Sequence, residues 1–170
     1  MRQGLQRYAR ISALLMAIGA LALVAIAVIL TQHLSLQPCH LCVFQRVLFL
    51  GISLALLFAW GGWNGRWIPK VSLIKSAVIS IGGLATAGYQ VWLQWYPQSS
   101  FGCGVGQQGI IERFVNWLAQ FSPLLFKAGG LCEEDDLVIF GLSIAVWSFL
   151  AFAGLLIGSL TLLMARRKKY

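Results

Sequence analysis

The chain has 170 residues, of which 59% are hydrophobic and only 11% are charged, and its mean hydropathy is +0.79. A soluble domain of this length exposes too much of its surface to hide so large an apolar fraction, so the composition indicates an integral membrane protein. The net charge of +8 does not indicate nucleic-acid binding, because the basic residues gather beside the apolar runs, where they orient a chain in the bilayer.

Four apolar runs are each long enough to cross the hydrocarbon of a bilayer as a helix. The first run exceeds the apolar core of an ordinary signal peptide, so we expect it to be retained. The fold class predicted is therefore all-α integral membrane, a single domain over residues 1–170 built as a four-transmembrane-helix bundle. The predicted spans are residues 11–30, 43–60, 71–93 and 137–164, with outer loops at 31–42 and 94–136 and a cytoplasmic turn at 61–70.

The charges predict the orientation of this bundle. Ten of the 13 basic residues flank the spans on one side, and all 5 acidic residues fall in the long loop on the other side. The positive-inside rule then predicts cytoplasmic N- and C-termini and outward-facing cysteine loops. Three tryptophans around the cytoplasmic turn, Trp60, Trp63 and Trp67, are suited to the headgroup layer.

The long outer loop contains a second helical pattern. Its apolar residues recur at helical spacing, and polar residues such as Glu112 and Asn116 occupy the other face. This pattern predicts a short interfacial helix that lies in the membrane surface with its apolar side toward lipid. The apolar positions are Ile110, Ile111, Phe114, Trp117, Leu118 and Phe121.

All four cysteines lie in the predicted outer loops, where an oxidising compartment lets disulfides persist. Cys39 and Cys42 have the C-x-x-C spacing, which permits a short-loop disulfide that is easily reduced. Cys103 and Cys132 are separated by 28 residues and would close the surface helix into a loop. One reducible pair beside one loop-closing pair favours electron transfer by thiol–disulfide exchange, although the spacing leaves three disulfide connectivities open.

The same cysteines admit other interpretations. Two structural disulfides can staple the outer loops of a non-catalytic protein. A zinc site is disfavoured, because one C-x-x-C with two distant cysteines is poor spacing for tetrahedral ligands. Attachment of haem c needs a histidine directly after the motif, where Val43 stands. We therefore predict no metal site.

Arg46 follows Cys42 by four residues, which places both on one helix face if the helix begins near the motif. Its guanidinium can stabilise a Cys42 thiolate and donate hydrogen bonds to an oxygen held beside it. The alternative is an interfacial arginine that snorkels toward water. Because the sequence contains no haem, flavin or iron–sulfur motif, a membrane quinone is the natural acceptor of electrons from the thiols.

Three stretches of the chain together form a family pattern. They are Pro38-Cys39-His40-Leu41-Cys42-Val43-Phe44-Gln45-Arg46, then Leu93-Gln94-Trp95-Tyr96-Pro97, and then the single cysteines Cys103 and Cys132. This pattern resembles the bacterial DsbB family of disulfide bond formation proteins and extends over nearly the whole chain. The C-x-x-C alone is a weak signal, but its combination with Arg46 and with the Leu-Gln-x-Tyr-Pro run is specific.

The resemblance implies that the protein reoxidises a periplasmic DsbA-like thioredoxin-fold oxidase and reduces ubiquinone or menaquinone in the bacterial inner membrane. It implies that the partner's reactive cysteine attacks Cys103 to give a mixed disulfide, and that Cys132 then exchanges with Cys39. Cys42 would face the quinone, with Arg46 as the quinone-proximal arginine.

One position departs from the family pattern. Family members often carry a basic residue, frequently histidine, where this chain has Gln90. A glutamine can donate a hydrogen bond to a quinone oxygen, but it cannot deliver a proton at neutral pH. We therefore expect Gln90 to bind the quinone rather than to act as a proton donor.

Two other functions remain as alternatives. A vitamin K epoxide reductase-like enzyme also combines four or five spans with a C-x-x-C, but there the motif falls late in the chain, whereas Cys39 precedes the second span. A non-catalytic four-span scaffold with structural disulfides predicts that a Cys39–Cys42 disulfide resists mild reductant.

Overall fold

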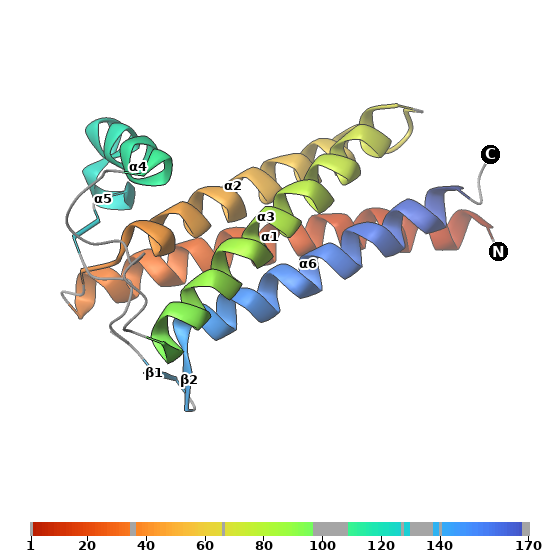
Figure 1. The fold of residues 1–170 in the computed structure, drawn as a ribbon. Helices are drawn as coiled ribbons and strands as arrows, with labels where there is room; N and C mark the ends of the chain where they lie inside the picture. Colours follow the sequence, from red (N-terminus) through yellow and green to blue (C-terminus); the bar gives the residue numbers. More distant parts are fainter. Residues whose placement is uncertain are drawn as a thin grey trace.

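The computed structural model describes residues 2–34, 37–65, 67–96, 109–126, 128–129, 138–139 and 141–167. Figure 1 shows the long helices α1 (Arg2–His33), α2 (His40–Gly61), α3 (Ile68–Trp95) and α6 (Ile144–Arg167) running along one bundle. Both chain termini lie at one end of it. At the opposite end lie the smaller elements: α4 (Ile110–Phe121), α5 (Pro123–Phe126), β1 (Val138–Ile139) and β2 (Leu142–Ser143).

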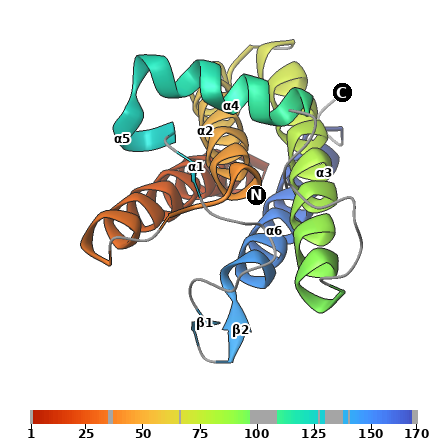
Figure 2. The same ribbon diagram turned by 60° about the vertical axis from the view of Figure 1, so that its left-hand side comes forward.

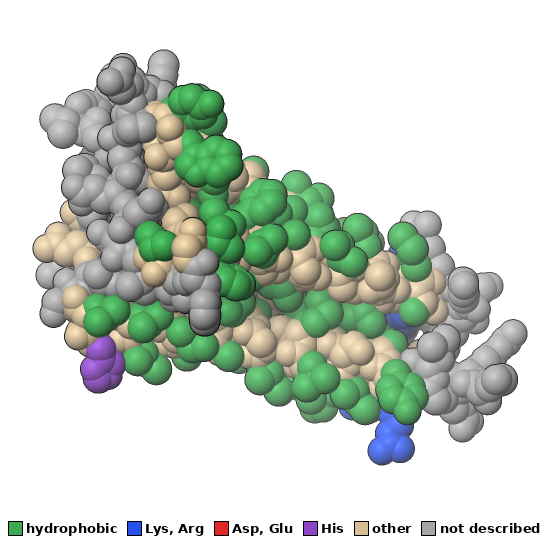
Figure 3. All heavy atoms as spheres, turned by 90° about the horizontal axis from the view of Figure 1, so that it is seen from below, with side chains coloured by type: hydrophobic (Ala, Val, Ile, Leu, Met, Phe, Trp, Pro, Cys, Tyr) green, Lys and Arg blue, Asp and Glu red, His purple; other side chains and the backbone are tan. Residues whose placement is uncertain are grey.

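The surface of the bundle is that of a membrane protein. In the described part of the chain, four helices are long and apolar enough to cross a membrane, which confirms the predicted four-span fold. Leu15, Val78 and Ile157 are each 62% exposed, and soluble proteins rarely expose large apolar patches. Figure 3 shows hydrophobic side chains along one face, with the basic side chains of that face gathered at the end that carries the termini.

The helices approach closely through small and aromatic residues. α2 packs against α1 and α3, and α3 packs against α6. The rings of Phe49 on α2 and Phe152 on α6 stack with centroids 4.0 Å apart, and a Cβ at Gly83 on α3 would overlap the Phe152 ring. A hydrogen bond of 2.9 Å between the hydroxyls of Ser76 and Ser159 also joins α3 to α6. Small residues and hydroxyl contacts of this kind stabilise helix pairs in lipid.

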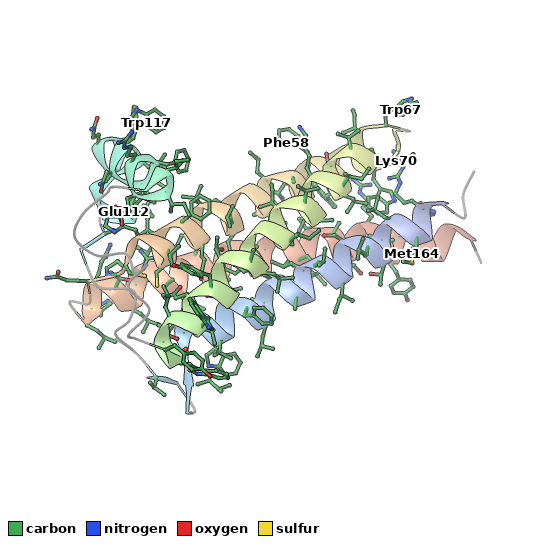
Figure 4. All side chains as sticks on the ribbon, viewed as in Figure 1. Phe58, Trp67, Lys70, Glu112, Trp117 and Met164 are labelled. Atoms are coloured by element: carbon green, nitrogen blue, oxygen red, sulfur yellow. The ribbon has the colours of Figure 1, made fainter. Side chains whose placement is uncertain are left out.

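A clamp holds the turn between α2 and α3 at the end that carries the termini. Arg166 donates to the carbonyl oxygens of Trp63 and Gly65, at 3.1 and 2.9 Å. Trp63 is only 3% exposed, and its indole N–H donates to the side chain of Gln6. Trp63 therefore packs against the protein, whereas Trp67 is 68% exposed and points away from the bundle (Figure 4). That these tryptophans lie at the depth of the headgroup layer stays a prediction.

The fourth long helix begins later than the sequence predicts. The predicted span starts at residue 137, but α6 starts at Ile144, and β1 and β2 form an antiparallel hairpin before it. Val138 and Ile139 are β-branched residues that favour strands, and Gly141 has a φ of 78°, which glycine adopts without strain. The apolar run that was predicted as one span therefore contains a hairpin followed by a helix.

The structure confirms a short helix, α4, between the third and fourth spans. Figure 2 shows that α4 runs across the bundle rather than along it. Val115 is buried on its inner side, whereas the exposed side carries a ridge of apolar residues, and Trp117 points away from the long helices (Figure 4). That this ridge lies in the membrane surface stays a prediction. The ridge consists of Ile110, Phe114, Trp117 and Phe121.

Candidate thiol–disulfide site

Cys39 and Cys42 lie at the first turn of α2, at the end of the bundle away from the termini. Cys39 is the residue before the helix and caps it, because its sulfur accepts a hydrogen bond of 3.3 Å from the backbone N–H of Cys42. The Cys39 thiol donates to the Cys42 sulfur, and the two sulfur atoms are 3.1 Å apart. The N-terminus of a helix favours negative charge, so this position suits cysteines that react as thiolates.

Gln90 approaches the same two sulfur atoms from α3. Its side-chain nitrogen Nε2 lies 2.9 Å from Cys42 Sγ and 3.6 Å from Cys39 Sγ. The Cys42 sulfur thus accepts hydrogen bonds both from the Gln90 amide and from the Cys39 thiol. The sequence predicts Gln90 as a quinone ligand, and the structure places it against Cys39 and Cys42.

Arg46 lies one turn further along α2 and is 7% exposed. Its Nη1 donates to the carbonyl oxygen of Leu125 in α5 at 3.4 Å. Its Nη2 donates to the carbonyl oxygen of Ala27 at 3.3 Å and to the hydroxyl of Thr31, both on α1. Arg46 follows Cys42 by four residues of α2, so its positive charge lies on the helix face that carries Cys42. Arg46 therefore joins α1, α2 and α5 beside the thiols.

Apolar side chains surround the cysteine pair. Leu41 and Leu93 are buried against Cys39, and Ile111 of α4 packs on the same cluster. Phe114 of α4 also meets the ring of Phe44 edge-on, with centroids 6.2 Å apart. Helix α4 thus covers one side of the pair, so the thiols lie in apolar surroundings near the end of the long helices.

The second predicted pair, Cys103 and Cys132, lies outside the residues that the structure describes. A neighbouring contact bears on their loop. The backbone N–H of Gly129, three residues before Cys132, donates to the carbonyl oxygen of Pro38 at 3.0 Å, and Pro38 directly precedes Cys39. Gly129 is therefore attached beside the first pair.

The described residues fit a quinone. A quinone needs hydrogen-bond donors for its carbonyl oxygens and apolar surroundings for its ring. Arg46 has five N–H groups, more than its three contacts to oxygens of described residues use. Gln90 carries an amide NH₂, which in this arrangement donates to the two sulfur atoms. Both stand beside the cysteine pair among apolar side chains, which suits a ligand that enters from lipid.

Sequence reasoning missed two residues of the site. Gln45, which is 3% exposed, donates from its Nε2 to Oε1 of Gln90 at 2.8 Å, and Thr31 accepts from Arg46. One signal could have drawn attention to Gln45. It is a polar residue near the start of an apolar span, three positions after Cys42 and thus on the same helix face. Thr31 carries no comparable signal.

Comparisons with known proteins agree with this site. Residues 9–162 match the family described as disulfide bond formation protein DsbB. A protein named disulfide bond formation protein B from Cupriavidus metallidurans is 38% identical over 170 residues, covering 98% of this chain and 99% of the relative. Its namesakes from Dechloromonas aromatica and Verminephrobacter eiseniae are 38% and 36% identical, over 81% and 90% of this chain and 82% and 84% of their own lengths. The chain therefore belongs to the DsbB family of disulfide bond formation proteins.

Proposed function

We propose that this protein is a quinone-dependent protein-disulfide oxidoreductase that reoxidises a DsbA-like thiol oxidase in the periplasm. Membership of the DsbB family supports an oxidoreductase that forms disulfides. In the net reaction, two thiols of the partner and one quinone become one disulfide and one quinol, so that two electrons and two protons leave the partner. The quinone is ubiquinone or menaquinone.

The arrangement around Cys42 is the observation that carries the proposal. Its sulfur lies 3.1 Å from the Cys39 sulfur and 2.9 Å from the Gln90 amide nitrogen. Arg46 stands one turn along the same helix, on the face that carries Cys42. A structural disulfide needs neither a buried arginine nor an amide donor at its sulfur, whereas a sulfur that carries negative charge is stabilised by both.

The four cysteines divide the work in this proposal. Cys103 forms the mixed disulfide with the partner, and Cys132 passes the electron pair to Cys39. Cys42 would be the thiol that reduces the quinone, and Arg46 and Gln90 would be the residues that bind the quinone oxygen and stabilise negative charge. The contact of Gly129 with Pro38 supports the exchange of Cys132 with Cys39, because it attaches the one segment to the other.

The orientation in the membrane is part of the proposal. We infer that the termini lie in the cytoplasm and the cysteines in the periplasm, because basic residues flank the spans at the end that carries both termini. The cysteines then face a compartment in which disulfides persist.

The test uses the full chain purified in detergent. A reduced DsbA-like oxidase and a short-chain ubiquinone are added, and the absorbance of the quinone is followed. We expect loss of the quinone signal that requires the oxidase and disappears in both Cys39→Ser and Cys42→Ser. If folded protein reduces neither ubiquinone nor a menaquinone analogue, the proposal fails and a non-catalytic four-span scaffold becomes the better account.

A further inference from the structure

Gln45 and Gln90 form a buried amide pair between α2 and α3. Each side chain is 3% exposed, and Nε2 of Gln45 donates to Oε1 of Gln90 at 2.8 Å. Burying a carboxamide without partners is unfavourable, so such a pair is expected where two of them meet in an apolar bundle. Gln90, however, has a second partner besides Gln45: its NH₂ group points at Cys42 Sγ.

The orientation of the Gln90 carboxamide decides whether a donor or an acceptor faces the Cys42 sulfur. A glutamine carboxamide can present either its oxygen or its nitrogen to a neighbour, and these two ends have opposite hydrogen-bonding character. Because Gln45 donates to the Gln90 oxygen, the Gln90 nitrogen is the end left facing the cysteines. The reverse orientation would turn an acceptor oxygen toward a sulfur that already accepts from Cys39, and it would repel a thiolate.

We infer that Gln45 is a positioning residue, which holds the Gln90 carboxamide with its NH₂ group donating to the Cys42 sulfur and so stabilises the thiolate of Cys42. Gln45 touches neither sulfur in this arrangement and acts through Gln90. The inference rests on the proposed function only in that the reaction uses Cys42 as a thiolate. The donor at the Cys42 sulfur thus depends on two side-chain amides, that of Gln90 on α3 and that of Gln45 on α2.

The test measures the reactivity of Cys42 in the full-length, reduced protein. Iodoacetamide is added at one fixed pH, and mass spectrometry follows alkylation of the Cys42 peptide over time. Gln45→Met and Gln90→Met keep the side-chain volume but remove the amide. We expect each to slow alkylation about three- to tenfold, the effect of losing one hydrogen bond of ordinary net strength. The double variant should be no slower than Gln90→Met alone, because Gln45 acts through Gln90.

A matched control separates this effect from general damage to the bundle. Gln94 lies one turn beyond Gln90 on α3, and its carboxamide oxygen accepts from the hydroxyl of Ser143 at 2.8 Å. Gln94→Met should leave the alkylation rate of Cys42 unchanged. Loosened packing would expose Cys42 and speed its alkylation, so a purely structural role for Gln45 predicts the opposite sign.

Two results would overturn the inference: an unchanged rate in Gln45→Met, or effects of the two substitutions that multiply in the double variant. The readout involves neither quinone nor partner protein. Slowed alkylation in a protein that reduces no quinone would therefore leave the inference standing and remove the proposed function. Quinone reduction that requires Cys42, with alkylation unchanged in Gln45→Met, would remove the inference alone.

Discussion

Arg46 is the residue at which three parts of the chain meet beside the thiols. Its partners among the described residues are uncharged oxygens: the carbonyls of Ala27 and Leu125 and the hydroxyl of Thr31. A buried guanidinium needs such oxygens, because desolvation of an unpaired charge is costly. With no carboxylate at these contacts to neutralise it, the positive charge remains available to a thiolate or to a ligand oxygen. Arg46 therefore has both a structural and an electrostatic role.

Replacement of Arg46 tests its electrostatic role by comparing the two half-reactions, quinone reduction and thiol exchange with the partner. In Arg46→Ala we expect the quinone reduction rate to fall about ten- to hundredfold, the effect of losing a charge-assisted hydrogen bond, while thiol exchange with the partner falls less. Arg46→Lys keeps the positive charge but not the planar guanidinium, so its quinone reduction rate should lie between those of the unchanged protein and Arg46→Ala. Single-turnover kinetics resolve the two half-reactions. Unchanged quinone affinity and turnover in Arg46→Ala would count against a role at the acceptor.

Cys103 provides a second test at the scale of single residues. In the proposed relay its sulfur is the one that the partner attacks, so Cys103→Ser should stop turnover and trap no mixed disulfide at that position. The measurement is non-reducing electrophoresis of the protein after mixing with a partner variant that lacks its second active-site cysteine. A fully active Cys103→Ser protein would remove the two-pair relay.

The sequence predicted the residues of the site that local spacing connects. Cys39, Cys42 and Arg46 lie within two turns of one helix, so their proximity follows from helix periodicity alone. Gln45 has a signal of the same kind, but its meaning depends on Gln90 of another helix. The hydrogen bonds of Arg46 to the carbonyl oxygens of Ala27 and Leu125 could not be predicted from the sequence, because every residue type has a backbone carbonyl. Such contacts are found only in the packed structure.

At the scale of elements, α3 shows how finely the helix contacts are set. Gly82 and Gly83 are adjacent in the sequence, yet a Cβ at Gly83 would overlap the Phe152 ring, whereas a Cβ at Gly82 would meet nothing within 4 Å. The sequence indicates that glycines let helices approach, but it does not say which of the two does so. The side that α3 turns toward α6 decides it.

This pair provides a matched stability test. Gly83→Ala should destabilise the bundle by about 1–3 kcal/mol, because the new methyl group must displace the Phe152 ring from its stack on Phe49. Gly82→Ala should be neutral or slightly stabilising, since alanine is the better helix former. Thermal unfolding in detergent compares the two variants. Equal melting temperatures would show that α3 and α6 pack less closely at this level.

The hairpin of β1 and β2 could not be predicted from hydropathy. The apolar run from residue 137 onward continues without a charge into α6, and apolar content alone does not distinguish a short strand from the first turns of a helix. The structural marker is Gly141, whose positive φ permits the turn. By contrast, α4 was predictable as a helix, because its apolar residues recur with helical period.

At the scale of the whole molecule, the two ends of the bundle differ in chemistry. The end that carries the termini is closed by cation–π and carbonyl contacts: Arg166 lies 4.8 Å from the Trp63 ring centre, and Arg10 lies 5.1 Å from that of Trp60. The opposite end carries Arg46 and two side-chain pairs, Cys39 with Cys42 and Gln45 with Gln90. Basic residues at the first end therefore hold the bundle together as well as carrying the charge that orients a membrane protein.

The orientation can be tested with reporter fusions, because alkaline phosphatase is active only outside the cytoplasm and green fluorescent protein folds well only inside it. When the reporters are fused after Tyr170, green fluorescent protein should fluoresce and alkaline phosphatase should be inactive. When they are fused to a chain truncated after Tyr96, at the end of α3, green fluorescent protein should be dark and alkaline phosphatase should be active. The basic flanks of α1 and α3 lie in the part of the chain that both fusions share, so they should insert alike.

The opposite pattern would place Cys39 and Cys42 in the reducing cytoplasm, where the thiol pool keeps such pairs reduced. The proposed flow of electrons from a periplasmic partner would then have no path to the site, however close the two sulfur atoms and Arg46 lie. The expected pattern would instead place Cys39 and Cys42 on the periplasmic side, where a partner can reach them. The step left to test would then be the transfer of electrons from Cys42 to a quinone.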